Sequence, residues 1–344
     1  MQLGERKLKI LQAIIDDYIN TAEPVGSRTI AKKYGIGISS ATIRNEMSDL
    51  EEMGYLEQPH TSAGRIPSDK AYRLYVDKLM KATAPSKEQM AAIKEYYEKK
   101  LEETEKVIIQ TAKVLSDLTN YTSLVLSPQL NKVVIRRIQL VAIDKGLALV
   151  VVVTSAGIVK DSIIRIPETV EPGDLEKISN MLTEKLNGHT IMESGLVLSQ
   201  AMKSEFIVQR ELVKRIADAI NKSIFNPKYK DVYLWGATNI FNFPEYHDIV
   251  KAKTFLSILE EKPLLFDLMI RGIERDINIT IGEENDVDEI KDCSIITATY
   301  KINDKTIGTI GIIGPTRMPY SNIISVIEHV EKKLSGILTE MSNE

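Results

Sequence analysis

The sequence predicts a multidomain α+β protein whose first domain is a winged helix-turn-helix. Three observations lead to this fold class. Two helical patterns, a Gly-containing turn and a third helix fill the first fifty residues, and a Gly- and Ser-rich basic hairpin follows them. From residue 124 onward, apolar strand patterns alternate with helices. A chain of 344 residues with 43% apolar content is long enough for two or three packed domains.

The N-terminal segment begins with a core helix. Apolar residues recur at helical spacing over residues 8–19, and Pro24 stops the pattern. A second, short helix is predicted from Ser27 and ends before Gly35. The order of helix, short helix, turn and helix is that of a helix-turn-helix.

The third helix, predicted over residues 39–53, has two different faces. Ile43, Met47 and Leu50 form one apolar stripe. The opposite face carries Arg44 and Asn45, side chains that can make bidentate hydrogen bonds to guanine and adenine, and its small side chains permit close approach to a major groove. The alternative is an ordinary solvated helix face, which the helix-turn-helix context disfavours. The residues predicted to contact DNA on this helix are Ser40, Ala41, Thr42, Arg44, Asn45 and Ser48.

A wing is predicted directly after this helix. Gly54 breaks the helical pattern, residues 55–57 form a strand, and a turn at residues 62–64 leads to a return strand around Arg65. An arginine in a wing can enter the minor groove or pair with a phosphate. The alternative is a polar hairpin without a role in binding. The predicted wing contacts are His60, Thr61, Ser62 and Arg65.

Charge in this domain is balanced in number but uneven in position. Residues 24–45 hold four basic residues and no acidic one, whereas residues 1–83 together hold 12 Lys and Arg against 11 Asp and Glu. Positive surface must therefore come from the placement of the charges. This balance favours a site-specific reader of double-stranded DNA over a non-specific coat. Because one winged helix reads about half of a symmetric operator, we expect a homodimer.

The segment from Ser39 to Leu79, SSATIRNEMSDLEEMGYLEQPHTSAGRIPSDKAYRLYVDKL, resembles the N-terminal signature of the HrcA-type heat-inducible transcription repressors. The match covers both the reading helix and the wing. The resemblance implies a repressor of bacterial heat-shock (chaperone) operons that binds an inverted-repeat operator, the CIRCE element, as a dimer. It also implies that the GroE chaperonin supports this activity.

The rest of the chain is predicted to combine helices with several strands. Pro85 marks a boundary, Ser86 and Gln89 can form a capping box, and one long helix or two in tandem extend to about residue 119. The segments IRRIQLVAID, GLALVVVVT and GIVKDSIIRI pair as a meander, with the apolar middle strand expected to be covered on both faces. A helix over residues 172–186, three strand segments after residue 276 and a final helix over residues 320–341 complete the pattern.

These segments predict an α+β domain divided by an insertion, and the resemblance implies that they are a GAF-like domain and a dimerising insert. The predicted boundaries are a winged helix-turn-helix over residues 1–83, a GAF-like domain with a leading linker helix over 84–189 and 263–344, and an inserted α/β dimerisation domain over 190–262. Within the insert we expect a helix from Glu205 to Ser223. The aromatic residues Trp235, Phe241 and Phe243 are candidates for the subunit contact, or alternatively fill the core of the insert.

Several function classes are disfavoured by what the sequence lacks. The single cysteine, Cys293, excludes an internal disulfide and a Cys-based zinc site, and it fits a reducing cytoplasm. The four histidines stand singly, so we predict no metal site, and no cofactor is expected. No apolar run approaches the ~18 residues that span a bilayer. Since no catalytic constellation is present, we expect no enzyme. The alternative function is a winged-helix regulator controlled by a small ligand in its GAF-like domain.

Overall fold

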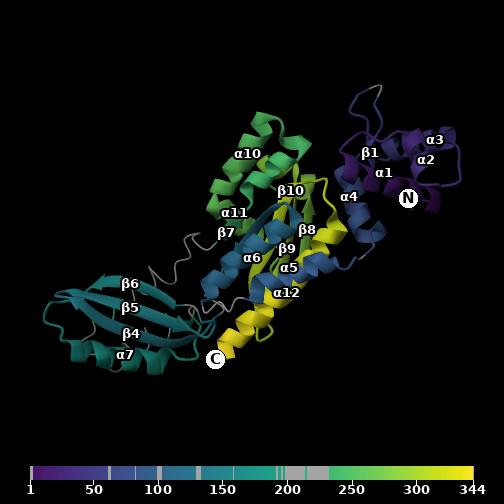
Figure 1. Cartoon of the computed structure of the whole chain (residues 1–344). Helices are drawn as coiled ribbons and strands as arrows, with labels where there is room; N and C mark the ends of the chain where they lie inside the picture. The colour runs from purple at the N-terminus through teal and green to yellow at the C-terminus, as the bar shows by residue number, and fades with distance from the viewer. Residues whose placement is uncertain are drawn as a thin grey trace.

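The computed structural model of the chain is elongated and has three parts in a row (Figure 1). It describes residues 3–60, 63–81, 83–98, 103–128, 133–157, 159–190, 193, 194, 197, 214 and 232–343. We call the parts the N-terminal domain (residues 3–81), the central body (83–128 and 232–343) and the distal unit (133–190). The N-terminal domain and the distal unit lie at opposite ends of the central body.

The N-terminal domain has the predicted winged-helix order. Helices α1 (Glu5–Thr21), α2 (Ser27–Lys33) and α3 (Ser40–Glu52) are followed by strands β1 (Leu56–Glu57) and β2 (Ile66–Pro67), which pair antiparallel. The chain before α2 joins this pair, because Val25 and Arg65 form an antiparallel bridge. Helix α4 (Asp69–Leu74) and a π-helical turn, η1 (Tyr75–Leu79), then lead towards the central body.

Two tandem helices, α5 (Lys87–Glu98) and α6 (Thr104–Thr119), open the central body. The predicted capping box at the start of α5 is confirmed. The backbone N–H of Ser86 donates to Gln89 Oε1 at 2.9 Å, and the backbone N–H of Gln89 donates to Ser86 Oγ at 3.1 Å. Two of the otherwise unpaired groups at this helix end are thereby satisfied.

An antiparallel five-stranded sheet forms the centre of the body. Its strands are β3 (Thr122–Leu126), β7 (Val232–Trp235), β8 (Ile277–Ile281), β9 (Cys293–Ile302) and β10 (Lys305–Pro315), in the order β7-β3-β10-β9-β8. Alternate residues of β10 belong to different cores, because Ile312 packs with α6 and α12 (Tyr320–Asn343), whereas Ile313 packs with α10 (Ile249–Glu260) and α11 (Lys262–Ile270). Helices therefore cover both faces of the sheet. The short helices η3 (Ala237–Asn242), η4 (Pro244–Tyr246), η5 (Gly282–Glu284) and η6 (Asp288–Ile290) connect these elements.

The distal unit is a separate three-stranded sheet with one helix. Strands β4 (Ile135–Asp144), β5 (Leu147–Thr154) and β6 (Val159–Arg165) form the predicted meander with β5 in the middle, and α7 (Pro172–Leu186) packs on it (Figure 1). The expectation that β5 is covered on both faces is wrong, because its residues alternate between buried and half-buried. On the face away from α7, Val141, Leu149 and Ile163 lie opposite one another across the three strands.

The division of the chain between the two larger sheets differs from the domain boundaries predicted from the sequence. The insert predicted over residues 190–262 contains β7 and α10, but β7 pairs with β3 and α10 packs in the core of the body. The separate sheet consists instead of residues 135–165, which lie within the predicted GAF-like domain. The pairing of β7 with β3 joins residues more than 100 positions apart, and local periodicity carries no information about such a pairing. The predicted helix from Glu205 to Ser223 lies outside the described residues.

Helix α12 reaches two other parts of the molecule. At its first residue, the Tyr320 ring lies 5.9 Å from the ring of Tyr72 in α4. Near its last residue, the Ser342 carbonyl accepts a hydrogen bond of 2.6 Å from the Arg136 guanidinium in β4. One helix of 24 residues therefore contacts the N-terminal domain at one end and the distal unit at the other.

Candidate nucleic-acid interface

Helix α3 is held in the N-terminal domain by its apolar stripe and its cap. The stripe predicted from spacing, Ile43, Met47 and Leu50, is buried in the domain core. The Ser39 hydroxyl accepts a hydrogen bond of 3.1 Å from the Thr42 backbone N–H, which satisfies one donor at the start of the helix. Because the inner face is fixed in this way, the orientation of the outer face is fixed too.

The outer face of α3 presents the residues predicted to read bases. Ala41, Arg44, Asn45 and Ser48 are exposed, and Ser40 and Thr42 are half-buried. Among the described residues, the side chains of Arg44 and Asn45 have no hydrogen-bond or ion-pair partner. Their donors and acceptors are therefore available to a ligand at this surface. Four of the predicted reading residues, Ala41, Arg44, Asn45 and Ser48, thus lie together on one exposed face, and Ser40 and Thr42 are less accessible.

The acidic residues of α3 are mostly neutralised by basic partners. Glu46 is buried and pairs with Lys7 at 2.5 Å and with Arg6. The same Lys7 ammonium lies 2.6 Å from Asp49. The hydrogen bond from Lys7, together with Arg6, lowers the pKa of the Glu46 carboxyl. The negative charge of α3 is thereby compensated on its α1 side. Sequence reasoning missed this arrangement because its partners lie 39 residues or more apart.

The wing is anchored at its base by Arg65. The Arg65 and Val25 backbones exchange two hydrogen bonds of 2.8 and 2.9 Å, and Arg65 Nε donates to Glu51 Oε2 at 2.8 Å. Gly64 lies so close to the Val25 backbone that an added Cβ would be only 2.5 Å from the Val25 carbonyl. In this structure Arg65 therefore connects the wing to α3 through its backbone and its Nε. His60 is exposed at the wing, while Thr61 and Ser62 lie outside the described residues.

The three aromatic residues considered for a subunit contact differ in exposure and all belong to the central body. Phe243 stacks on Tyr121 with ring centroids 4.7 Å apart, so it fills the core. Phe241 is 50% exposed, and Trp235 is 41% exposed with the Lys113 ammonium 5.6 Å from its ring. The alternative of a core role thus applies to Phe243, and only Trp235 and Phe241 offer apolar surface.

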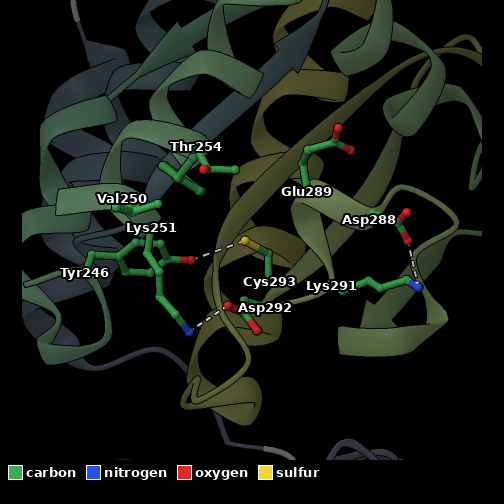
Figure 2. A pocket seen from close by; sticks show the side chains of 10 residues that line it. Tyr246, Val250, Lys251, Thr254, Asp288, Glu289, Lys291, Asp292 and Cys293 are labelled. Carbon is green, nitrogen blue, oxygen red and sulfur yellow. Dashed lines mark hydrogen bonds and ion pairs between the residues drawn. The ribbon is translucent and has the colours of Figure 1, made fainter. Parts of the chain in front are cut away.

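A cavity of about 220 Å³ lies beside Cys293 in the central body (Figure 2). The Tyr246 hydroxyl is 3.2 Å from Cys293 Sγ, and burial raises the pKa of this thiol to about 12. Cys293 is therefore an inert thiol of the core. At the rim, Lys251 pairs with Asp292 at 2.7 Å.

Within the described residues, no group of His, Cys, Asp or Glu side chains has the arrangement of a metal site. None of the described helices could cross a membrane.

Comparison with known proteins covers nearly the whole chain. The family model for the winged helix-turn-helix DNA-binding domain of the HrcA transcription repressor matches residues 2–80, and the model for the HrcA C-terminal domain matches residues 105–324. The chain is 50% identical over 338 residues to the heat-inducible transcription repressor HrcA of Ruminiclostridium cellulolyticum, a match that covers 97% of each chain. It is 46% identical to the repressor of the same name from Pelotomaculum thermopropionicum, over 98% of this chain and 97% of the other. A crystal structure described as that of a hypothetical protein aligns with a TM-score of 0.67 and 25% identity, over 99% of this chain and all of the other.

Proposed function

This chain belongs to the HrcA family of heat-inducible transcription repressors, and we propose that it binds an inverted-repeat operator of the CIRCE type as a homodimer, with the GroE chaperonin supporting its activity. As a member of this family it is a DNA-binding repressor of heat-shock genes, which is not an enzyme class. The observation that carries the operator proposal is the exposed pair Arg44 and Asn45 on α3.

In the proposed complex, α3 enters the major groove with Arg44 and Asn45 towards base edges. Arginine recognises guanine O6 and N7, and asparagine recognises adenine N6 and N7. The small side chains of Ala41 and Ser48 let the helix approach the groove closely. The remaining predicted contacts, Ser40, Thr42, His60, Thr61, Ser62 and Arg65, position the domain on the backbone and in the adjacent groove.

The proposed dimer is supported by the uncovered face of the distal sheet. Val141, Ile143, Val159 and Ile163 are 43 to 63% exposed there. Large exposed apolar patches on a folded protein mark interaction sites. We place the main subunit contact on this face, while Trp235 and Phe241 form a second, smaller candidate. Cytoplasmic location follows from the proposed partners, DNA and chaperonin.

DNA footprinting on an inverted-repeat operator tests the reading face. Arg44→Ala or Asn45→Ala should each weaken operator binding by about 1 to 3 kcal/mol per lost base contact, without unfolding the domain. Lys9→Ala is the matched control, since it removes a charge that is 63% exposed and that pairs with Glu5 on α1 instead of lying on α3. Operator affinity at the wild-type level in the Arg44→Ala and Asn45→Ala double variant would rule out α3 as the reader.

The role of the chaperonin requires its own experiment. We expect purified GroE chaperonin to increase the fraction of repressor that binds the operator, and repression in cells to weaken when chaperonin is depleted.

The competing function is control by a small ligand, and the cavity beside Cys293 is the place where we would look for one. A ligand-dependent rise in the melting temperature of the full chain, with no chaperonin effect, would favour that alternative.

A further inference from the structure

The N-terminal domain and the central body share one hydrophobic core. Ile14 and Leu50 of the N-terminal domain belong to the same cluster of buried side chains as Ile281, Tyr300 and Tyr320 of the body. Tyr72 of α4 lies at the junction and is almost fully buried against Tyr320. The DNA-reading domain is thus packed against the body and is not connected to it by a flexible linker alone.

A first arginine crosses this junction from the N-terminal side. Arg73 of α4 binds both carboxylate oxygens of Glu284, at 2.7 Å through Nε, and donates a hydrogen bond of 2.7 Å to the Ile279 carbonyl in β8. Glu284 is itself oriented, because its carboxylate accepts the Ile281 backbone N–H at 2.9 Å. A bidentate pair of this kind fixes the angle between its two partners as well as their distance.

The loop that meets α4 is shaped for a close approach. The Asp69 carboxylate accepts the backbone N–H of Glu283 at 2.9 Å. At the neighbouring Gly282, an added Cβ would lie 1.8 Å from the same carboxylate, and φ is +54°. Only glycine allows the loop to contact α4 this closely.

A second arginine crosses the junction from the body. Arg317, between β10 and α12, binds Glu245 through Nε at 2.6 Å and Nη2 at 3.1 Å, and its Nη1 donates to the Ile19 carbonyl of α1 at 2.6 Å. Its side chain is only 11% exposed. The Ile19 carbonyl is in the last turn of α1, where carbonyls lack partners within the helix. A cation there also interacts favourably with the helix dipole.

We propose that Arg73 and Arg317 are positioning residues for operator recognition. They hold each reading helix at one angle to the body, and the body together with the distal unit, where we place the main subunit contact, thereby sets the distance between the two reading helices of the dimer. This inference rests on the proposed dimeric binding to an inverted repeat. A fixed distance makes the protein selective for one spacing between operator half-sites, because half-sites at another spacing cannot be contacted at the same time.

The test uses the full-length chain and DNA duplexes whose two half-sites are separated by spacers that increase in single base pairs over one helical turn. We expect the wild type to prefer one spacing by about tenfold or more over spacings half a turn away. Arg73→Ala should reduce this preference to about threefold or less, while affinity for a duplex with a single half-site stays unchanged. A merely structural defect would lower binding to the single half-site as well.

Three further variants make the test specific. Arg271→Ala breaks an exposed ion pair with Asp286 inside the body and should leave the spacing profile as in the wild type. Arg73→Glu should flatten the profile, and adding Glu284→Arg should restore it. For the second arginine we use Arg317→Gln together with Glu245→Gln, which avoids leaving the Glu245 carboxylate unpaired.

The outcomes are distinguishable. If the wild type shows no preference for any inverted repeat, the proposed dimeric operator binding fails. If the wild type is selective and Arg73→Ala keeps the same spacing profile, the positioning role of Arg73 is overturned. A rise in affinity for the optimal operator in Arg73→Ala also overturns it, since the contact would then oppose DNA binding.

Discussion

Replacing Gly64 with alanine should detach the base of the wing from the rest of the N-terminal domain. The added Cβ would lie 2.5 Å from the carbonyl carbon and oxygen of Val25, whereas ordinary contacts begin at 3.4 Å. The wing backbone must therefore move by roughly 1 Å, which lengthens the Val25–Arg65 hydrogen bonds beyond bonding distance. Two such bonds contribute about 1 to 3 kcal/mol together. The cost is local, because the helices of the domain are not touched.

Amide hydrogen exchange measures this effect directly. In Gly64→Ala, the amides of Val25 and Arg65 should exchange roughly 5- to 150-fold faster than in the wild type, while amides of α1 and α3 keep their protection. Operator affinity should fall in parallel, since the wing no longer has a fixed place beside α3. Gly336→Ala is the control, because an added Cβ meets nothing within 4 Å there. Unchanged exchange at Val25 and Arg65 would refute the steric reasoning.

Three further outcomes are expected. Gly336→Ala should stabilise the chain by about 0.5 to 1 kcal/mol, because it replaces an exposed glycine inside α12, and thermal unfolding will show this. Lys7 and Arg6 hold the pKa of Glu46 below its ordinary value of 4.5, so ionised Glu46 stabilises the fold fully above pH 4.5, and this contribution is lost as the pH falls through the folded-state pKa. Urea midpoints measured from pH 7 to 3 should therefore drop less at the acid end in Glu46→Gln than in the wild type, and parallel curves would count against the coupling. Tyr72→Phe should stabilise by about 1 kcal/mol, because the buried Tyr72 hydroxyl has no partner among the described residues; a lower melting temperature would show that the hydroxyl is satisfied.

The reading helix was largely predictable from its sequence. The period of Ile43, Met47 and Leu50 defines the buried face, and the exposure of Arg44 and Asn45 follows from the same geometry. What periodicity misses is the burial of Glu46, which becomes favourable only because α1 places Arg6 and Lys7 beside it. A charged residue is expected to be exposed. It can be buried where the fold brings a residue of opposite charge beside it.

The division of the rest of the chain was less predictable. The strand segments and the helix over residues 172–186 appear where the patterns indicate them, yet β7, which lies within the predicted insert, joins the sheet of the central body. Membership of a sheet depends on which edge is free to pair, and β3 offers that edge far away in the sequence. The partner of a single side chain is equally hard to predict from local sequence. The hairpin pattern assigns Arg65 to DNA, whereas in the structure Arg65 pairs with Glu51.

Helix α12 gives this molecule a fixed internal length. At about 1.5 Å per residue, its 24 residues form a rod of about 36 Å between Tyr72 at one end and Arg136 at the other. A tilt of the rod by about 5° about one end displaces the other by about 3 Å, which is as long as a hydrogen bond. The contacts at both ends therefore depend on α12 keeping its angle to the sheet, which its packing along β9 and α6 maintains.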